Sequence, residues 1–225
     1  MTPNICVSIK PKSSTEAVNL IEKAEAVKAD FVEVRLDNLV SPKFEDISAA
    51  TKIPLIATNK LSNEGGNFGG THAQRWQTLI EAAKNGFQYV DLDLTALSLK
   101  EQIVNLKSLG VKTIVSFHKF DGAFTAKEMQ HILDEEIING ADVCKIVGTA
   151  KNVQDNLIAL NFILENAAKT QIVCFCMGEQ GRISRLLSPV FGAFFTFAAL
   201  EQGSETALGQ ISINEMRTAY SLLRQ

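Results

Sequence analysis

Three consecutive segments decide the fold: KTIVSFH at 112–118, TAKEMQHILDEEIING at 125–140 and DVCKIVG at 142–148. The first and third are short, apolar and rich in Val and Ile. The middle segment has the apolar spacing of an amphipathic helix and ends at a glycine. A strand, a helix and a second strand in this order predict parallel strands that are covered by the helix.

The same alternation extends from this unit toward both ends of the chain. Strands are predicted at 5–9, 31–37, 54–58, 89–94, 112–118, 142–148, 172–178 and 194–199. Helices are predicted at 14–29, 43–51, 72–86, 98–110, 125–140, 152–169 and 213–224, with a helical turn at 182–189. About eight strand-then-helix units in 225 residues predict an α/β fold of the (β/α)8 TIM barrel type, as a single domain over 1–225. A doubly wound open sheet is the alternative.

Composition excludes several classes of protein. Hydrophobic residues make up 46% of the chain and charged residues 21%, and the net charge is -3, so no nucleic-acid partner is indicated. The N-terminus lacks the pattern of a signal peptide, and no stretch of 18 apolar residues occurs. We therefore expect a cytoplasmic protein that does not associate with membranes.

The four cysteines give no sign of a disulfide framework or a zinc site. Cys6, Cys144, Cys174 and Cys176 all lie in apolar segments that are predicted as strands. No histidine lies close to them in sequence, as a zinc site of the usual spacing would require. We interpret them as small buried side chains in a reducing compartment.

Polar residues alternate with apolar ones along several predicted strands. Glu33, Arg35 and Asp37 share one face of their strand, and Ser116 and His118 share one face of theirs. In a barrel the apolar faces meet the helices, so the polar faces should converge inside, near the carboxyl ends of the strands.

Not all of these inward charges need a catalytic role. We expect Asp37, Asp91 and Asp93 to pair internally and organise the barrel. Lys145 and His118 each stand near the carboxyl end of a strand, where barrel enzymes place their active sites.

A buried lysine has a known chemical use. Burial and neighbouring positive charge should lower the pKa of Lys145 from about 10.4 toward neutrality, and a neutral amine can form a Schiff base with a ketone or aldehyde. Such chemistry needs a general base, and His118 is the candidate. His72 and His131 have the sequence context of surface or capping residues.

Seven stretches carry a resemblance to a known family. They are EVRLD (33–37), EGG (64–66), SFHKF (116–120), GADVCKI (140–146), MGEQGRISR (177–185), PVFGAFFTFA (189–198) and ALGQIS (207–212). In this order they make the chain resemble the type I 3-dehydroquinate dehydratases, the Schiff-base enzymes of the shikimate pathway. The resemblance runs along the whole chain.

The resemblance implies a reaction, in which 3-dehydroquinate loses water to give 3-dehydroshikimate. Lys145 would form the imine with the C3 ketone. His118 would remove the C2 proton and later return a proton as the C1 hydroxyl leaves. Glu64 looks like the family carboxylate that orients His118. No metal or diffusible cofactor is implied.

The resemblance also implies a set of substrate-binding residues. Arg185, with its planar fork, suits the substrate carboxylate, and Gln210 would assist it. Glu33 and Arg35 suit the ring hydroxyls, and Ser8 matches a serine of the family pocket. The loop before Gln210 is expected to act as a lid.

Two departures from the family pattern concern this set. Lys60 stands where the family usually has an arginine, so we expect a substrate contact of altered geometry. In the lid, Leu208 replaces a proline, and either Thr206 or Ser204 supplies the hydroxyl that contacts the substrate.

Three further expectations come from comparison with the family. Relatives are commonly homodimers, so we expect a homodimer. No N-terminal hairpin plug precedes the first strand, so side chains must close the bottom of the barrel or leave it shallow. The alternative function is another lysine-imine barrel enzyme, such as a class I aldolase, which should favour a phosphate site in its Gly-rich loops.

Overall fold

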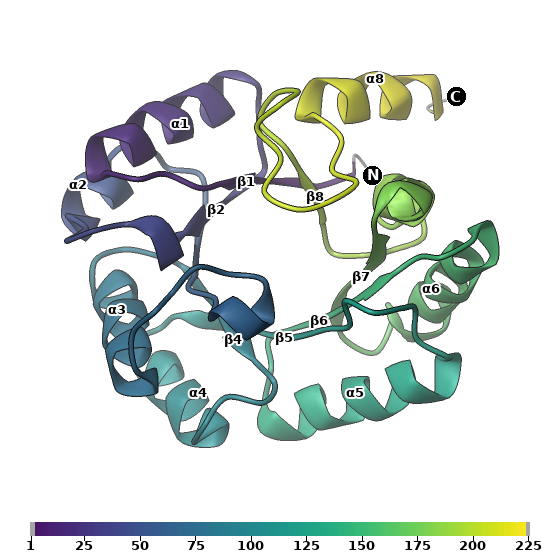
Figure 1. Ribbon diagram of the computed structural model, residues 1–225, viewed down its shortest axis with the longest axis horizontal. Coiled ribbons are helices and arrows are strands. Elements are labelled where there is room, and N and C mark those ends of the chain that lie inside the picture. Colours follow the sequence, from purple (N-terminus) through teal and green to yellow (C-terminus); the bar gives the residue numbers. More distant parts are fainter. Residues whose placement is uncertain (1–2, 224–225) are drawn as a thin grey trace.

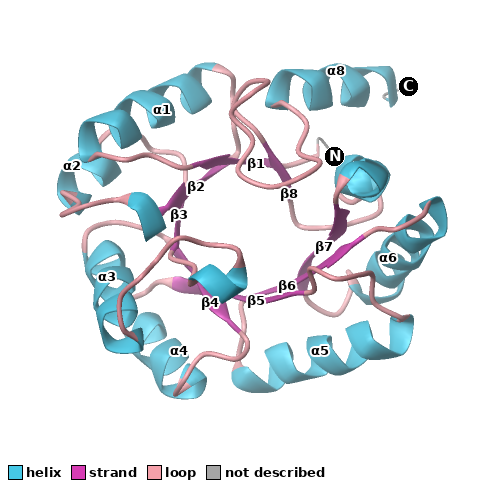
Figure 2. Ribbon diagram, in the orientation of Figure 1, coloured by secondary structure: helices cyan, strands magenta, loops and turns pink. Residues whose placement is uncertain are grey.

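The computed structural model describes residues 3–223, and within them eight parallel strands form the inner ring of a barrel. The strands are hydrogen-bonded in the order β7-β6-β5-β4-β3-β2-β1-β8, and the helices lie around the outside (Figure 1, Figure 2). At the remaining seam, the backbone N–H of Phe194, just before β8, donates to the carbonyl of Ile172 on β7 at 2.8 Å. The predicted (β/α)8 barrel is therefore confirmed.

The elements follow the predicted alternation closely. The strands are β1 (Ile5–Ile9), β2 (Phe31–Arg35), β3 (Leu55–Thr58), β4 (Tyr89–Asp93), β5 (Lys112–His118), β6 (Val143–Thr149), β7 (Gln171–Met177) and β8 (Thr196–Ala198). The α-helices are α1 (Ser14–Ala26), α2 (Phe44–Ala49), α3 (His72–Lys84), α4 (Leu99–Ser108), α5 (Ala126–Asn139), α6 (Val153–Asn166), α7 (Arg182–Leu187) and α8 (Ile213–Leu223). Short 3-10 helices are η1 (Leu36–Asn38), η2 (Ser62–Glu64) and η3 (Glu179–Gly181).

The second strand is shorter than predicted. It ends at Arg35, and the chain turns into η1, so Asp37 does not continue the strand face. The Asp37 carboxylate instead folds back onto the Arg35 guanidinium, with Nε 2.7 Å from Oδ1 and Nη2 2.9 Å from Oδ2. The other predicted ends differ from the observed ones by three residues or fewer, and Arg224, predicted to lie in the last helix, is outside the described residues.

Both faces of the strands are buried, but they bury different side chains. On β2, Val32 and Val34 belong to the apolar layer between the strands and the helices, whereas Glu33 and Arg35 point into the barrel. Both charged residues are 8% exposed or less. The alternation along the strand thus separates an apolar outer layer from a polar barrel interior, as the sequence predicted.

Aromatic rings close the end of the barrel at which the strands begin. Phe31 and Tyr89 are the first residues of β2 and β4, and their ring centroids lie 5.7 Å apart in an edge-to-face arrangement. Phe195, just before β8, lies 5.0 Å from Phe31. In the described residues, side chains therefore fill this end of the barrel.

In the part of the chain that the structure describes, no helix has the length and apolar character needed to cross a membrane.

Candidate active site

A cavity of about 370 Å³ opens at the carboxyl ends of the strands. Nine of the ten residues predicted for the site line it: Glu33, Arg35, Lys60, Glu64, His118, Lys145, Arg185, Thr206 and Gln210. The tenth, Ser8, lies outside the lining and is 1% exposed. Four of the nine are strand residues and the others lie in the segments that follow strands, so polar strand faces and loops meet in one cavity, at the end where barrel enzymes bind their substrates.

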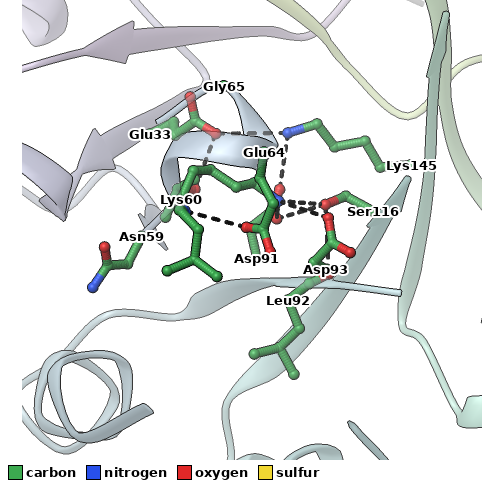
Figure 3. A network of polar contacts seen from close by, with 12 residues as sticks. Glu33, Asn59, Lys60, Glu64, Gly65, Asp91, Leu92, Asp93, Ser116 and Lys145 are labelled. Carbon is green, nitrogen blue, oxygen red and sulfur yellow. Dashed lines mark hydrogen bonds and ion pairs between the residues drawn. The ribbon is translucent and has the colours of Figure 1, made fainter. Parts of the chain in front are cut away.

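Lys145 is the third of the seven residues of β6 rather than a residue near its carboxyl end, as was predicted, and its side chain lines this cavity. Its Nζ donates to Asp91 Oδ2 at 2.8 Å and lies 3.7 Å from Glu33 Oε1 (Figure 3). The same atom stands 4.3 Å from the centroid of the Phe197 ring. Burial alone would lower the pKa of Lys145, but the charges of Asp91 and Glu33 outweigh it and raise the pKa. The predicted lowering was wrong because the nearest charges are carboxylates.

Asp91 is the fully buried counter-ion of this lysine. Its Oδ1 lies 2.8 Å from Lys60 Nζ and accepts a hydrogen bond from Ser116 Oγ at 2.7 Å. Burial would raise the pKa of Asp91, but Lys145 and Lys60 hold it well below its usual range. The carboxylate therefore pairs inside the barrel, as expected, although no pattern in the sequence revealed that it joins two lysines.

Lys60 follows β3 and is 4% exposed. Besides Asp91, its Nζ binds Ser116 Oγ at 2.8 Å and lies 3.9 Å from Asp93 Oδ2. The predicted substrate contact thus lines the cavity, but its ammonium group is held by the network shown in Figure 3.

His118 ends β5 beside the cavity. Its Nδ1 atom is buried and has no hydrogen-bond partner among the described residues, and its ring stacks on Phe120 with centroids 6.1 Å apart. Burial, followed by the positive charges of Lys60 and Lys145, lowers the pKa of His118 well below its ordinary value. The imidazole is therefore neutral at neutral pH and able to accept a proton.

Glu64 does not pair with His118 as expected. Arg75 on α3 donates from Nη1 to Glu64 Oε1 at 2.9 Å, and its Nη2 lies 2.9 Å from Oε2. The backbone N–H of Leu61 also donates to Oε2, at 3.3 Å. Glu64 thus lies on the cavity wall, but its carboxylate faces a guanidinium fork that was not among the predicted site residues.

Arg75 also fixes the chain after β3. Its Nε donates to the carbonyl of Asn59 at 2.7 Å, and the residue is 4% exposed. The only signal in the sequence was an arginine on a helix whose neighbours Leu79 and Ala82 are buried. This pattern does not identify Glu64 as the partner of Arg75.

Two further carboxylate networks, around Glu33 and around Asp37, lie beside the cavity. Glu33 accepts hydrogen bonds from Thr58 Oγ1 at 3.0 Å and from Ser8 Oγ. Ser8 in turn accepts one from Thr206 Oγ1 at 2.8 Å. Arg35, bound by Asp37, also donates to the carbonyl of Gly65 at 3.2 Å. Ser8 therefore supports Glu33 and the lid from below the cavity surface.

Arg185 on α7 is a buried cation that faces the cavity. It is 1% exposed, its guanidinium carbon stands 4.3 Å from the centroid of the Phe175 ring, and burial lowers its pKa to about 9. Nη2 donates to the carbonyl of Leu208 at 3.3 Å. Nε has no hydrogen-bond partner, and no carboxylate pairs with the guanidinium, in residues 3–223. An anionic group in the cavity would satisfy it.

The loop between β8 and α8, yellow in Figure 1, lies at the rim of the barrel and covers this cation. Gln210 Oε1 accepts from the backbone N–H of Thr206 at 2.7 Å, and the backbone N–H of Gly178 donates to the carbonyl of Leu208 at 3.2 Å. Thr206 lines the cavity, whereas Ser204 bonds to the backbone of Glu201. Of the two hydroxyls left open by the sequence, Thr206 is the one at the cavity.

Residues 3–223 contain no group of three or more His, Cys, Asp or Glu side chains arranged to hold a metal ion.

Comparisons with known proteins agree along the whole chain. A family model described as type I 3-dehydroquinase matches residues 5–225. The 3-dehydroquinate dehydratase of Desulfotalea psychrophila is 32% identical over 221 residues, which cover 96% of each chain. Among solved structures, the 3-dehydroquinate dehydratase from Geobacillus kaustophilus has a TM-score of 0.89 at 25% identity and covers 98% of this chain and 91% of its own. A type I 3-dehydroquinate dehydratase from Clostridium difficile, solved with covalent modified comenic acid, has a TM-score of 0.87 at 26% identity and covers 99% of this chain and 92% of its own.

Proposed function

The chain belongs to the type I 3-dehydroquinase family, hydro-lyases that convert 3-dehydroquinate to 3-dehydroshikimate and water, and from this membership we propose that Lys145 and His118 carry the reaction through a Schiff base. The observation that carries the proposal is the place of Lys145. Its amine lies in a cavity at the carboxyl ends of the strands, beside a histidine that is neutral at neutral pH.

The first step is imine formation at Lys145. The Lys145 ammonium gives up a proton, the neutral nitrogen attacks the C3 ketone carbon to form a carbinolamine, and the hydroxyl of the carbinolamine takes a proton back and leaves as water, which gives a protonated imine. This cation stands where the ammonium group stood, beside Asp91 and Glu33, so the same carboxylates that hold the lysine stabilise it. The structure of the clostridial relative with covalent modified comenic acid supports covalent chemistry in this family.

The second step is proton removal by His118. The imine draws electrons from C2, so the C2 proton becomes acidic and the neutral imidazole takes it, which gives an enamine. The enamine then expels the C1 hydroxyl, and His118 supplies the proton with which it leaves as water. Hydrolysis of the imine by another water releases 3-dehydroshikimate and restores the amine.

Substrate binding in this proposal uses the groups that the cavity leaves available. Arg185, a buried cation without a carboxylate partner in the described residues, binds the substrate carboxylate. Gln210 and Thr206 reach the substrate from the lid, and Glu33 and Arg35 bind its hydroxyls. Ser8 acts indirectly, through its hydrogen bonds with Glu33 and Thr206.

Glu64 has a different place in the proposal from the one the sequence suggested. Its carboxylate is bound by Arg75, so in this arrangement it shapes the cavity wall beside His118 without a hydrogen bond to the imidazole. We propose that Glu64 acts on His118 through its charge or through a water molecule between them.

Reductive trapping tests the proposal. The protein is mixed with 3-dehydroquinate, borohydride is added, and the modified peptide is mapped by mass spectrometry. We expect a substrate-derived adduct on Lys145 and none in Lys145→Met. Lys60, an amine on the same cavity wall, is the internal control. A folded protein that forms no adduct, or forms it on Lys60, would overturn the proposal.

The same assay separates the aldolase alternative. Phosphorylated aldol substrates should leave no adduct on Lys145, because the chain matches the dehydroquinase family over residues 5–225. An adduct with these substrates but not with 3-dehydroquinate would favour the aldolase.

We also propose that the chain folds as one domain over residues 1–225, forms homodimers and lies in the cytoplasm. Leu222 and Leu223 on α8 are 82% and 55% exposed, which supports a surface for a partner subunit. All four cysteines are free, which supports a reducing compartment. Light scattering should give twice the chain mass of 24.6 kDa, and cell fractionation checks the location. A mass of one chain would contradict the dimer, and two separate unfolding transitions would contradict the single domain.

A further inference from the structure

Two lysines share one buried carboxylate at the floor of the cavity. Lys145 Nζ lies 2.8 Å from Oδ2 of Asp91, and Lys60 Nζ lies 2.8 Å from Oδ1 (Figure 3). All three residues are 5% exposed or less. Each oxygen of the carboxylate thus faces one ammonium group, in a place that solvent hardly reaches.

The second lysine is held in this position by more than its charge. Lys60 donates to Ser116 Oγ at 2.8 Å, and the same hydroxyl donates to Asp91 Oδ1 at 2.7 Å. Lys60, Ser116 and one oxygen of Asp91 therefore form a closed triangle of short contacts. The ammonium group is directed at the carboxylate before any substrate arrives.

We propose that Lys60 is a positioning residue for Lys145, because its ammonium group keeps Asp91 compensated when Lys145 gives up its proton to become a nucleophile. This inference rests on the proposed function, in which Lys145 must attack a ketone as a neutral amine. Without Lys60, that proton loss would leave a buried carboxylate with no cation against it, which is costly.

The direction of the effect follows from the charges around Lys145. The titratable groups that face it are Cys6 from β1, Glu33 and Arg35 from β2, Lys60 after β3, Asp91 from β4 and His118 from β5, while β8 contributes the ring of Phe197. Arg35 is bound by Asp37, and the pKa of His118 is lowered, so the imidazole is neutral. In the described part of the chain, the cation that competes with Lys145 for Asp91 is therefore Lys60.

Competition for one anion makes the neutral form of Lys145 easier to reach. Lys60 satisfies one oxygen of Asp91 and repels the ammonium of Lys145, and both effects favour loss of a proton from Lys145. Glu33 and Asp91 still hold that ammonium in place between turnovers. A cation beside a nucleophilic lysine is a general way of activating it.

The test uses a reagent that lacks every group by which the substrate is recognised. Formaldehyde reacts with the neutral amine, water leaves, and hydride from cyanoborohydride reduces the imine to an N-methyl group. Mass spectrometry gives the rate of methylation of Lys145 between pH 6 and pH 10. In Lys60→Met we expect the profile to move up by about 1 pH unit or more, so that methylation at pH 7 falls about tenfold.

Two variants make this result specific. Lys60→Arg keeps the charge and should leave the Lys145 profile near that of the unchanged protein. Lys119→Met removes a lysine that pairs with Glu128 at 3.1 Å outside the cavity, and it should also leave the profile in place. If Lys60→Met does not fold, Lys60→Gln serves instead, because its amide can still donate to Ser116.

An unchanged methylation profile in Lys60→Met would overturn the inference, and so would an equal shift in Lys119→Met. If Lys60 only contacts substrate, Lys60→Met should raise KM for 3-dehydroquinate without moving the profile. Failure of the proposed function itself is seen separately, as the absence of a borohydride-trapped adduct on Lys145 in the unchanged protein.

Discussion

At the scale of single residues, His118 couples the chemistry of the cavity to the stability of the chain. Burial and the charges of Lys60 and Lys145 lower its pKa in the folded state, whereas the unfolded chain has the ordinary pKa of about 6.5. Below pH 6.5 the unfolded state therefore binds a proton that the folded state does not. The free energy of unfolding must fall as the pH falls through this range.

This linkage gives a prediction for His118→Gln. Between pH 7.5 and pH 5.5 the unchanged protein should lose about 1 kcal/mol more of unfolding free energy than the variant, because glutamine does not titrate. Urea denaturation at both pH values measures the difference. Equal losses in the two proteins would show that the folded state protonates His118 as readily as the unfolded chain does.

Arg75 is a second residue whose role can be tested by substitution. Arg75→Met removes the fork that binds Glu64 and the donor to the carbonyl of Asn59. Removing one partner of a buried ion pair leaves the other charge uncompensated, so we expect a loss of about 2–4 kcal/mol in the free energy of unfolding. Denaturant titration measures this loss.

The control for Arg75 is Arg75→Lys, which keeps the charge but cannot reach both oxygens of Glu64 and the Asn59 carbonyl together. Its loss should lie between those of the unchanged protein and Arg75→Met. Arg75→Met as stable as the unchanged protein would mean that the pair contributes nothing.

These residues also show what sequence can predict about a site. Alternation along a strand gave the face of Lys145 and His118, and that was enough to bring both to the cavity. It could not give partners, because pairing depends on reach and direction across strands. The sharing of Asp91 by two lysines and the binding of Glu64 by Arg75 are therefore structural findings.

At the scale of elements, the lid loop depends on a close approach of two backbone segments. A Cβ at Gly209 would stand 2.2 Å from the carbonyl oxygen of Gly178, and the residue has φ +73°. The loop position is therefore tied to glycine at 209. This contact brings Leu208, Thr206 and Gln210 over the cavity.

Gly209→Ala should displace the lid and raise KM for 3-dehydroquinate about tenfold or more, with borohydride trapping at Lys145 retained at high substrate concentration. Gly203→Ala is a matched control in the same loop, since Gly203 has φ +88° but nothing within 4 Å of an added Cβ. Steady-state kinetics of both variants separate close contact from backbone strain. An equal rise of KM in the two would assign the effect to strain alone.

Element boundaries were predicted well where glycine or a capping residue marks them, and less well where a side chain turns the backbone. Gly140, the predicted last residue of its helix, is the C-cap of α5 with φ +93°, and α5 ends one residue earlier, at Asn139. The strand predicted at 31–37 continued too far because Asp37 fits the alternation of polar residues. Asp37 forms an ion pair with Arg35, two residues earlier, where the chain turns. The alternation pattern does not predict such a pair.

At the scale of the whole molecule, one buried carboxylate lies outside the cavity, on a helix of the outer layer. Glu136 on α5 is fully buried, and in the described residues neither of its carboxylate oxygens has a hydrogen-bond partner of regular geometry. Burial, with the charge of Asp91, raises its pKa well above the ordinary value. The folded chain therefore holds a proton there that the unfolded chain releases above about pH 4.5.

Glu136→Gln should consequently flatten the pH dependence of stability. The folded state binds the extra proton, so the free energy of unfolding of the unchanged protein falls as the pH rises from about 4.5 toward the raised pKa. The variant carries a neutral amide throughout and should gain on the unchanged protein between pH 5 and pH 8. Thermal or urea unfolding at several pH values measures this. A constant difference between the two proteins would contradict it.

The barrel itself was predictable because each strand-then-helix unit repeats the same two hydrophobic periods along the chain. The sequence did not predict how the end of the barrel at which the strands begin is closed. Phe31 and Tyr89 begin strands, and aromatic residues at such positions fit an outer apolar layer as well as an inner plug. Only the arrangement of the strands around the ring decides between these two places.

The aromatic rings packed at the start of the strands also affect how molecules move during turnover. In the described part of the chain, these rings pack at the other end of the barrel and do not line the cavity, so molecules reach and leave the cavity through the mouth beneath the β8–α8 loop. Substrate enters by that opening, and product and the eliminated water leave by it. A bound product therefore prevents the next substrate from binding. Product inhibition should accordingly be competitive with respect to 3-dehydroquinate.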